Sequence, residues 1–143
     1  MDENKRVLVT GGAGFIGSHV VRNLLDLGVD IRVIDDLSAG KADLIPSEVT
    51  VDQVDIRSDE AAETIVQYRP THIIHLAAIH YIPYCNEHPE ETFGVNVMGT
   101  RNVLHAARTI DSVESLVYSS SAAVYPPRDG ANQETSSVGP TDI

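Results

Sequence analysis

A glycine-rich run near the start of the chain constrains its fold more than any other feature. The run Thr10-Gly11-Gly12-Ala13-Gly14-Phe15-Ile16-Gly17 follows a short β-branched stretch, residues 6–10, and precedes apolar residues at helical spacing. Gly11 allows a tight exit from the strand, Gly14 lets a ligand approach the backbone, and Gly17 lets helix and strand pack closely. The run therefore predicts a strand, a tight turn and a helix whose first N–H groups can hold a phosphate.

Strand and helix patterns alternate along the rest of the chain. The first helix ends at Gly28, and a second begins after Ser58, a good N-cap, and ends before Pro70. Further short apolar or β-branched runs predict strands at residues 31–35, 49–54, 71–76 and 114–118. Strands separated by helices imply right-handed crossovers. We therefore expect an α/β fold with a doubly wound, Rossmann-type parallel sheet of about five strands.

A long helix is expected at residues 90–108. Its inward-facing side chains are expected to be those of Phe93, Val97, Val103 and Leu104. The stretch before it, with Tyr81, Tyr84 and His88, is interpreted as a loop that either touches a substrate or is ordinary surface. From Ala122 onward the chain is rich in Pro, Gly, Ser and Asn, which predicts a loop.

An acidic residue stands where a dinucleotide fold needs one. Asp35 ends the second predicted strand, 18 residues after Gly17. Its carboxylate can accept hydrogen bonds from both ribose hydroxyls of an adenosine and would repel a 2′-phosphate, so the sequence favours NAD over NADP. The alternative is a tight strand-to-helix turn followed by an Asp in a solvated loop.

Two further strand ends carry residues suited to the same ligand. Asp55 follows the third predicted strand and can accept from an adenine amino group while Ile56 packs on the ring; an N-cap or loop Asp is the alternative. The small residues in Leu76-Ala77-Ala78 follow the fourth strand and let the backbone run close to a cofactor. Ordinary packing of small residues explains them as well.

Composition narrows the function classes. The formal net charge of −11 argues against a nucleic-acid partner, which calls for a basic face. No run of about 18 apolar residues occurs, so no membrane partner is expected. Cys85 is the one cysteine and no signal-peptide pattern precedes the first strand, which favours a reducing cytoplasm. The 143 residues fit one domain, residues 1–143.

Histidines are the remaining candidates for metal chemistry. The spacing of His72, His75 and His80 fits no common zinc pattern. On alternating strand positions, His72 and His75 would also point to opposite faces. We therefore expect no metal site.

Taken together, these motifs identify a resemblance. The chain resembles the extended short-chain dehydrogenase/reductase family, the NAD-dependent epimerase/dehydratase group that acts on nucleotide sugars, and within it the UDP-glucose 4-epimerase-like enzymes. The segments that carry the resemblance are Thr10 to Gly17, Asp35-Asp36-Leu37, Asp55-Ile56, His75-Leu76-Ala77-Ala78, Asn96-Val97-Met98-Gly99-Thr100 and Tyr118-Ser119-Ser120-Ser121-Ala122-Ala123-Val124-Tyr125.

The resemblance implies a role for each matched position. For the cofactor, it implies Phe15 and Ile16 at the pyrophosphate, Asp35, Asp36, Leu37 and Ser38 at the adenosine ribose, Asp55 and Ile56 at the adenine, Leu76, Ala77, Ala78 and His80 along the path to the nicotinamide ribose, Asn96 facing the cofactor, and Ser119 close to the nicotinamide. Ser121 matches the catalytic Ser/Thr that hydrogen-bonds the reacting sugar hydroxyl.

One part of the family pattern does not occur. The family's base is a Tyr whose pKa is lowered by a Lys four residues later and by the positive nicotinamide. The lysines here are Lys5 and Lys41, so no Tyr-x-x-x-Lys exists in these 143 residues. The resemblance therefore implies the amino-terminal part of a longer enzyme, without the later strands and the substrate domain.

Three functions remain open on the sequence. The chain is the NAD-binding portion of a nucleotide-sugar epimerase/dehydratase-type oxidoreductase, inactive by itself; or a dinucleotide-binding module without catalysis; or an NAD-sensing relative that acts through a partner. The resemblance also implies a nucleotide-sugar substrate for the full-length enzyme and a homodimer formed through the long helix.

Overall fold

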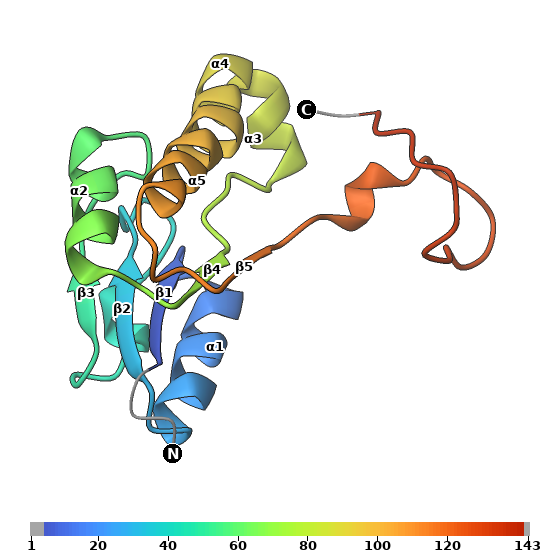
Figure 1. Cartoon of the computed structure of the whole chain (residues 1–143). Helices are drawn as coiled ribbons and strands as arrows, with labels where there is room; N and C mark the ends of the chain where they lie inside the picture. The colour runs from blue at the N-terminus through green and yellow to red at the C-terminus, as the bar shows by residue number, and fades with distance from the viewer. Residues whose placement is uncertain (1–4, 142–143) are drawn as a thin grey trace.

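Five parallel strands form the centre of the structure, a computed structural model that describes residues 5–141 (Figure 1). They are β1 (Arg6–Thr10), β2 (Asp30–Ile34), β3 (Thr50–Asp52), β4 (His72–His75) and β5 (Ser115–Tyr118), in the order β3-β2-β1-β4-β5. The chain runs outward from β1 to β3 and then returns to the other side of β1 for β4. This arrangement confirms the predicted doubly wound parallel sheet, whose order reverses between β1 and β4.

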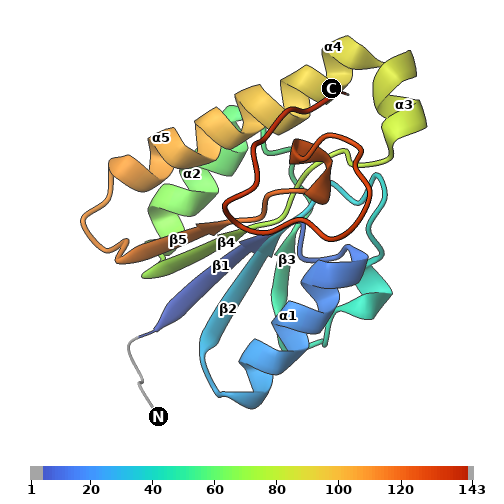
Figure 2. The same cartoon turned by 90° about the vertical axis from the view of Figure 1, so that its right-hand side faces the viewer.

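Helices cover both faces of this sheet (Figure 2). They are α1 (Phe15–Asp26), α2 (Asp59–Tyr68), α3 (Ile82–Glu87), α4 (Pro89–Phe93) and α5 (Thr100–Arg108), with a π-helical segment, η2 (Gly94–Gly99), between the last two and short 3₁₀ turns at η1 (Ala42–Leu44) and η3 (Ala122–Val124). Helix α1 lies on one face, and α2 and α5 lie on the other. The ends of the predicted domain, residues 1–4 and 142–143, lie outside the described residues.

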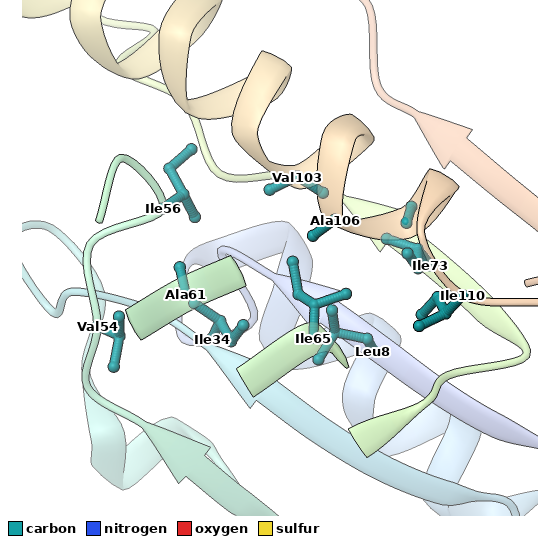
Figure 3. Close-up of a cluster of buried hydrophobic side chains, with 11 residues drawn as sticks. Leu8, Ile34, Val54, Ile56, Ala61, Ile65, Ile73, Val103, Ala106 and Ile110 are labelled. Carbon is teal, nitrogen blue, oxygen red and sulfur yellow. The ribbon is translucent and has the colours of Figure 1, made fainter. Parts of the chain in front are cut away.

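Alternating strand side chains build one core on each face. Val7, Val9 and Val33 pack toward α1, while Leu8 and Ile73 pack toward α2 and α5. Figure 3 shows the second cluster, where side chains from α2 and α5 close over the sheet. Removing these apolar groups from water on both faces is what makes an all-parallel sheet stable.

Local signals set the ends of α2 as predicted. The Ser58 Oγ accepts a hydrogen bond from the Ala61 N–H at 3.2 Å and so caps the helix start. At the other end Arg69 adopts a left-handed conformation, φ 52°, immediately before Pro70. The cap and the proline therefore place the helix where the sequence indicates.

The prediction for the long helix was partly wrong. The π-helical segment interrupts it, and Phe93, Val97 and Leu104 are about half exposed; of the four predicted inward residues, Val103 alone is buried. A π turn holds more residues than an α turn, so the apolar spacing read at 3.6 residues per turn loses its phase there. The stretch predicted as a loop before it contains the six-residue helix α3.

Within residues 5–141, none of the helices combines the length and the apolar character that crossing a membrane requires.

Candidate dinucleotide-binding site

The glycine turn lies at the carboxyl end of β1, beside the point where the strand order reverses. Gly11 has φ 69°, and a Cβ there would lie 2.6 Å from the Ala77 backbone nitrogen, so the predicted tight exit is confirmed. A Cβ on Gly17 would overlap the Gly11 carbonyl oxygen and lie 2.6 Å from the Gly12 Cα. Gly17 thus packs on the turn itself, whereas the sequence predicted packing against the strand.

The start of α1 is open toward solvent. Gly14 is its N-cap, no side chain caps the helix, and a Cβ on Gly14 would meet only the Gly11 carbonyl oxygen, at 3.4 Å. Phe15 and Ile16 follow in the first turn and are 81% and 62% exposed. Uncapped N–H groups at the positive end of a helix dipole fit an anionic group such as a pyrophosphate.

Asp35 stands beside this turn. It is 7% exposed, its Oδ2 accepts from the Ala13 N–H and its Oδ1 accepts from the Leu37 N–H, both at 2.9 Å. A carboxylate has about four acceptor sites, so these two bonds orient it and leave capacity for ligand hydroxyls. Sequence reasoning missed two neighbours: Ala13, and Gly40, whose Cβ would lie 2.8 Å from the Asp35 Oδ1. The glycine five residues after the acid was the available signal.

The residues that follow Asp35, which the resemblance assigns to the adenosine ribose, form a loop closed by its own hydrogen bonds. Asp36 Oδ1 accepts from the Ser38 N–H at 2.9 Å and from its hydroxyl at 2.6 Å. Leu37, between them, has φ 60°. The exposed Asp36 adds a second negative charge next to Asp35, which disfavours a phosphate at this position.

Asp55 and Ile56 follow β3 and take different environments. Asp55 pairs with the Arg57 side chain, and those hydrogen bonds hold the pKa of the carboxyl below its usual range. Ile56 is 4% exposed, and its side chain fills a notch at Gly99, where a Cβ would lie 2.5 Å from the Ile56 Cδ1. This side chain belongs largely to the core, and its predicted packing on an adenine ring stays a prediction.

The segment after β4 passes close to the turn. The Leu76 N–H donates to the Thr10 carbonyl at 3.0 Å, and Ala77 lies against Gly11, while Ala78 and His80 are exposed. The close approach of the two backbones therefore depends on Gly11, and the predicted closeness of this segment to a cofactor stays a prediction.

Asn96 anchors the next residue of the same segment. Its Oδ1 accepts from the Ile79 N–H at 2.8 Å, and its Nδ2 donates to the Ile79 carbonyl at 2.9 Å. The predicted contact of Asn96 with a cofactor stays a prediction. The structure shows its amide engaged with Ile79 on both sides.

A buried histidine connects the strands to the long helix, and sequence reasoning missed it. His75 is 2% exposed, with its Nδ1 2.5 Å from the Thr10 Oγ1 and its Nε2 2.8 Å from the Thr100 Oγ1. The Thr100 hydroxyl donates to the Asn96 carbonyl at 2.8 Å, so it accepts from a protonated Nε2, and the Nδ1 accepts from Thr10. Burial lowers the pKa of His75 to about 4, which favours this neutral form.

The predicted catalytic hydroxyl is held by a short turn after β5. The Ser119 N–H donates to the His75 carbonyl at 3.2 Å and so continues the sheet edge. Ser121 is exposed, and its Oγ accepts from the Ala123 N–H at 3.1 Å as the cap of η3. The turn, Asp35 and Ala77 are therefore brought together by packing, whereas Ser121 is oriented by its own local turn.

No cluster of three or more His, Cys, Asp or Glu side chains suited to a metal ion occurs within residues 5–141.

Comparisons with known proteins identify what this geometry is similar to. The sequence model of the NAD dependent epimerase/dehydratase family matches residues 7–142. Among curated proteins, the UDP-glucose 4-epimerase of Azospirillum brasilense is 38% identical over 121 residues, which are 84% of this chain and 34% of that protein. The chain thus spans about a third of the length of such relatives.

Solved structures agree in fold. The UDP-glucose 4-epimerase of Thermus thermophilus, solved in complex with NAD, is 40% identical with a TM-score of 0.89, covering 96% of this chain and 45% of that one. The UDP-glucose 4-epimerase of Thermotoga maritima, solved with UDP-glucose, is 30% identical with a TM-score of 0.89, again covering 96% and 45%.

Proposed function

The chain belongs to the NAD dependent epimerase/dehydratase family, and from that premise we propose that its residues form the NAD-binding portion of a nucleotide-sugar epimerase. NAD is the cofactor of this family, and when bound it supplies a hydride acceptor. We propose one domain over residues 1–143 that binds and orients this cofactor. The relatives are longer, and the matched segment covers 34% of the Azospirillum protein and 45% of the Thermus chain.

The observation that carries the proposal is the buried Asp35 carboxylate fixed beside the glycine turn. Its two hydrogen bonds, to Ala13 and Leu37, hold it next to the open start of α1, so one rigid unit presents both an anion site and a ribose acceptor. The remaining assigned cofactor residues lie in the first turn of α1, just after the carboxyl ends of β2, β3, β4 and β5, or, for Asn96, in η2. We propose that they contact the dinucleotide along its length.

Specificity for NAD follows from charge. A 2′-phosphate at the adenosine ribose would meet the carboxylates of Asp35 and Asp36, and like charges at close range disfavour it. We expect isothermal calorimetry to give at least tenfold tighter binding of NAD than of NADP, on the order of 1.4 kcal/mol or more. Equal or reversed affinities would contradict the assignment of Asp35. The variant Asp35→Asn should reduce the difference in affinity between NAD and NADP, because it removes one of the two negative charges.

For the reaction, Ser121 is proposed to hydrogen-bond the sugar hydroxyl and Ser119 to lie near the nicotinamide. The Ser121 Oγ uses a lone pair for its cap, so its O–H remains available to donate. Since no Tyr-x-x-x-Lys occurs in the chain, we expect no measurable turnover of UDP-glucose by these 143 residues. Turnover in a coupled assay would show that another group serves as the base.

The Asp35 carboxylate fixed beside the glycine turn fits a second candidate function equally well, that of a non-catalytic or NAD-sensing module. Exposed apolar side chains on β5 and the long helix, Val117, Tyr118, Val97, Met98 and Leu104, support self-association of such a module into a homodimer. An NAD-dependent change of mass in light scattering would favour the sensing function.

We also propose that the protein is located in a reducing cytoplasm. The buried Cys85, which forms no disulfide, fits this location.

A further inference from the structure

Three N–H groups of Arg57 donate hydrogen bonds to the Asp55 carboxylate. Its Oδ1 accepts from the Arg57 backbone N–H at 2.8 Å and from the Nε at 3.0 Å, and its Oδ2 accepts from the Nε at 2.9 Å and the Nη2 at 2.5 Å. Three N–H groups thus converge on a carboxylate with about four acceptor sites. The Nε–H is shared between the two oxygens, so the four contacts come from three donors and one acceptor position remains. Its direction is set by the guanidinium plane.

The long helix fixes the loop that carries this pair. The Asn102 Nδ2 donates to the carbonyls of Ile56 and Ser58, both at 2.8 Å. The Arg57 side chain passes over Gly94, where a Cβ would lie 3.5 Å from its Nη1. The carboxylate is therefore held relative to the helix layer as well as to β3.

We propose that Arg57 is a positioning residue that makes this site selective for adenine. By fixing the Asp55 carboxylate, Arg57 leaves a single acceptor that meets one N–H donor, the 6-amino group of the base. The inference rests on the proposed NAD-binding function. A base with a carbonyl at that position would place a lone pair against the carboxylate, which is the repulsive element that selectivity needs.

Without the guanidinium the same carboxylate would discriminate less. Asp55 is part-exposed, so an unpaired carboxylate would rotate and satisfy its acceptors with water, whichever base is bound. Bidentate pairing with Arg removes that freedom, and a Lys cannot reproduce it because its ammonium is a point charge on a flexible stem.

The test compares NAD with nicotinamide hypoxanthine dinucleotide, in which a carbonyl replaces the 6-amino group. Calorimetry on the 143-residue chain should give roughly tenfold tighter binding of NAD, the scale of one hydrogen bond to a charged group. In Arg57→Met and in Arg57→Lys we expect this ratio to fall to about twofold or less.

The Arg32–Asp52 ion pair, between β2 and β3, provides a matched control for the Arg57–Asp55 pair. Arg32 and Asp52 form a similar two-pronged pair, with Nε–Oδ2 2.6 Å and Nη2–Oδ1 2.8 Å, between β2 and β3. Arg32→Met removes that pair and should keep the tenfold ratio, because a general loss of stability weakens both dinucleotides equally.

The outcomes separate the two levels of the proposal. Failure of the native chain to bind NAD would overturn the proposed function, and the inference with it. Binding of NAD together with an unchanged ratio in the Arg57 variants, or no preference in the native chain, would overturn the inference alone. If Arg57→Met does not fold by circular dichroism, Arg57→Lys decides.

Discussion

Two glycine-containing regions of this molecule are held in opposite ways. In the turn after β1, Cβ atoms on Gly11 and Gly17 would strike backbone, at 2.6 Å from the Ala77 nitrogen and the Gly12 Cα. In the segment after β5, Gly130 also has a positive φ, 86°, but no atom of the described part of the chain lies within 4 Å of its Cβ position. Gly11 and Gly17 are therefore enclosed by packed backbone, whereas Gly130 has open space around it among the described residues.

The later segment rests on a few hydrogen bonds. The Gly139 N–H donates to the Val124 carbonyl at 2.8 Å and closes a loop, inside which Ser136 bonds Arg128 and Gln133. Nearly every residue of this segment is exposed, and it lies to one side of the sheet (Figure 1). Packing therefore fixes the conformation of the proposed cofactor region, whereas local hydrogen bonds orient the proposed catalytic hydroxyl of Ser121.

The largest test of this difference is a pair of glycine substitutions. Gly17→Ala should lower the free energy of unfolding by roughly 3 kcal/mol or more, because backbone cannot give way to the new methyl group. Gly139→Ala should change it by about 0.5 kcal/mol or less, since its Cβ would lie 3.7 Å from Pro126, an ordinary contact. Urea denaturation measures both changes; similar losses at the two positions would contradict the difference in packing between the two regions.

The buried histidine gives the next effect. The pKa of His75 is about 4 in the folded chain and about 6.5 when unfolded, so between these values the unfolded state binds more protons. Stability contributed by neutral His75 is complete above pH 6.5 and is lost as pH falls toward 4, by about 2–3 kcal/mol. Denaturation at several pH values should show this slope reduced in His75→Gln and retained in His72→Gln. An equal slope in both variants would contradict it.

Proteolysis of the native chain probes the same difference between the two regions without any substitution. Arg128 is the one Lys or Arg after Arg108, and it lies in the exposed loop, so trypsin should cut there first. We expect cleavage at least about tenfold faster than at Arg32 in the sheet, because local opening requires less free energy in the loop. Mass spectrometry of early products measures this; a first cut within α1 or α5 would oppose it.

The smallest expected effect is that of Ser121→Ala. Its Oγ is exposed and, among residues 5–141, bonds only the Ala123 N–H, so we expect stability to change by about 0.5 kcal/mol or less. Affinity for NAD should change by about twofold or less, which calorimetry can show. A large loss of affinity would mean that this hydroxyl is part of the cofactor region after all.

Local signals predicted much of the fold because they act over a few residues. The glycine turn, the Ser58 cap and the strand at residues 71–76 each depend on neighbours in sequence. The long helix was predicted less well, since the π-helical segment depends on how the helix packs, and Val97 and Leu104 consequently face outward. The same limit hid His75, whose partners are 65 and 25 residues away.

The sequence by itself determined the strand–turn–helix unit, the parallel sheet and the acid at the end of β2, because periodicity, glycine and capping are local properties of the chain. Tertiary structure alone decided which groups share a carboxylate or a hydroxyl. It placed Ala13 on Asp35 and His75 between Thr10 and Thr100, since those contacts depend on side-chain direction and on distances between elements. Gly11 is thus required by the backbone of the loop after β4, which is distant in the sequence. Gly17 is required by the backbone of the turn itself.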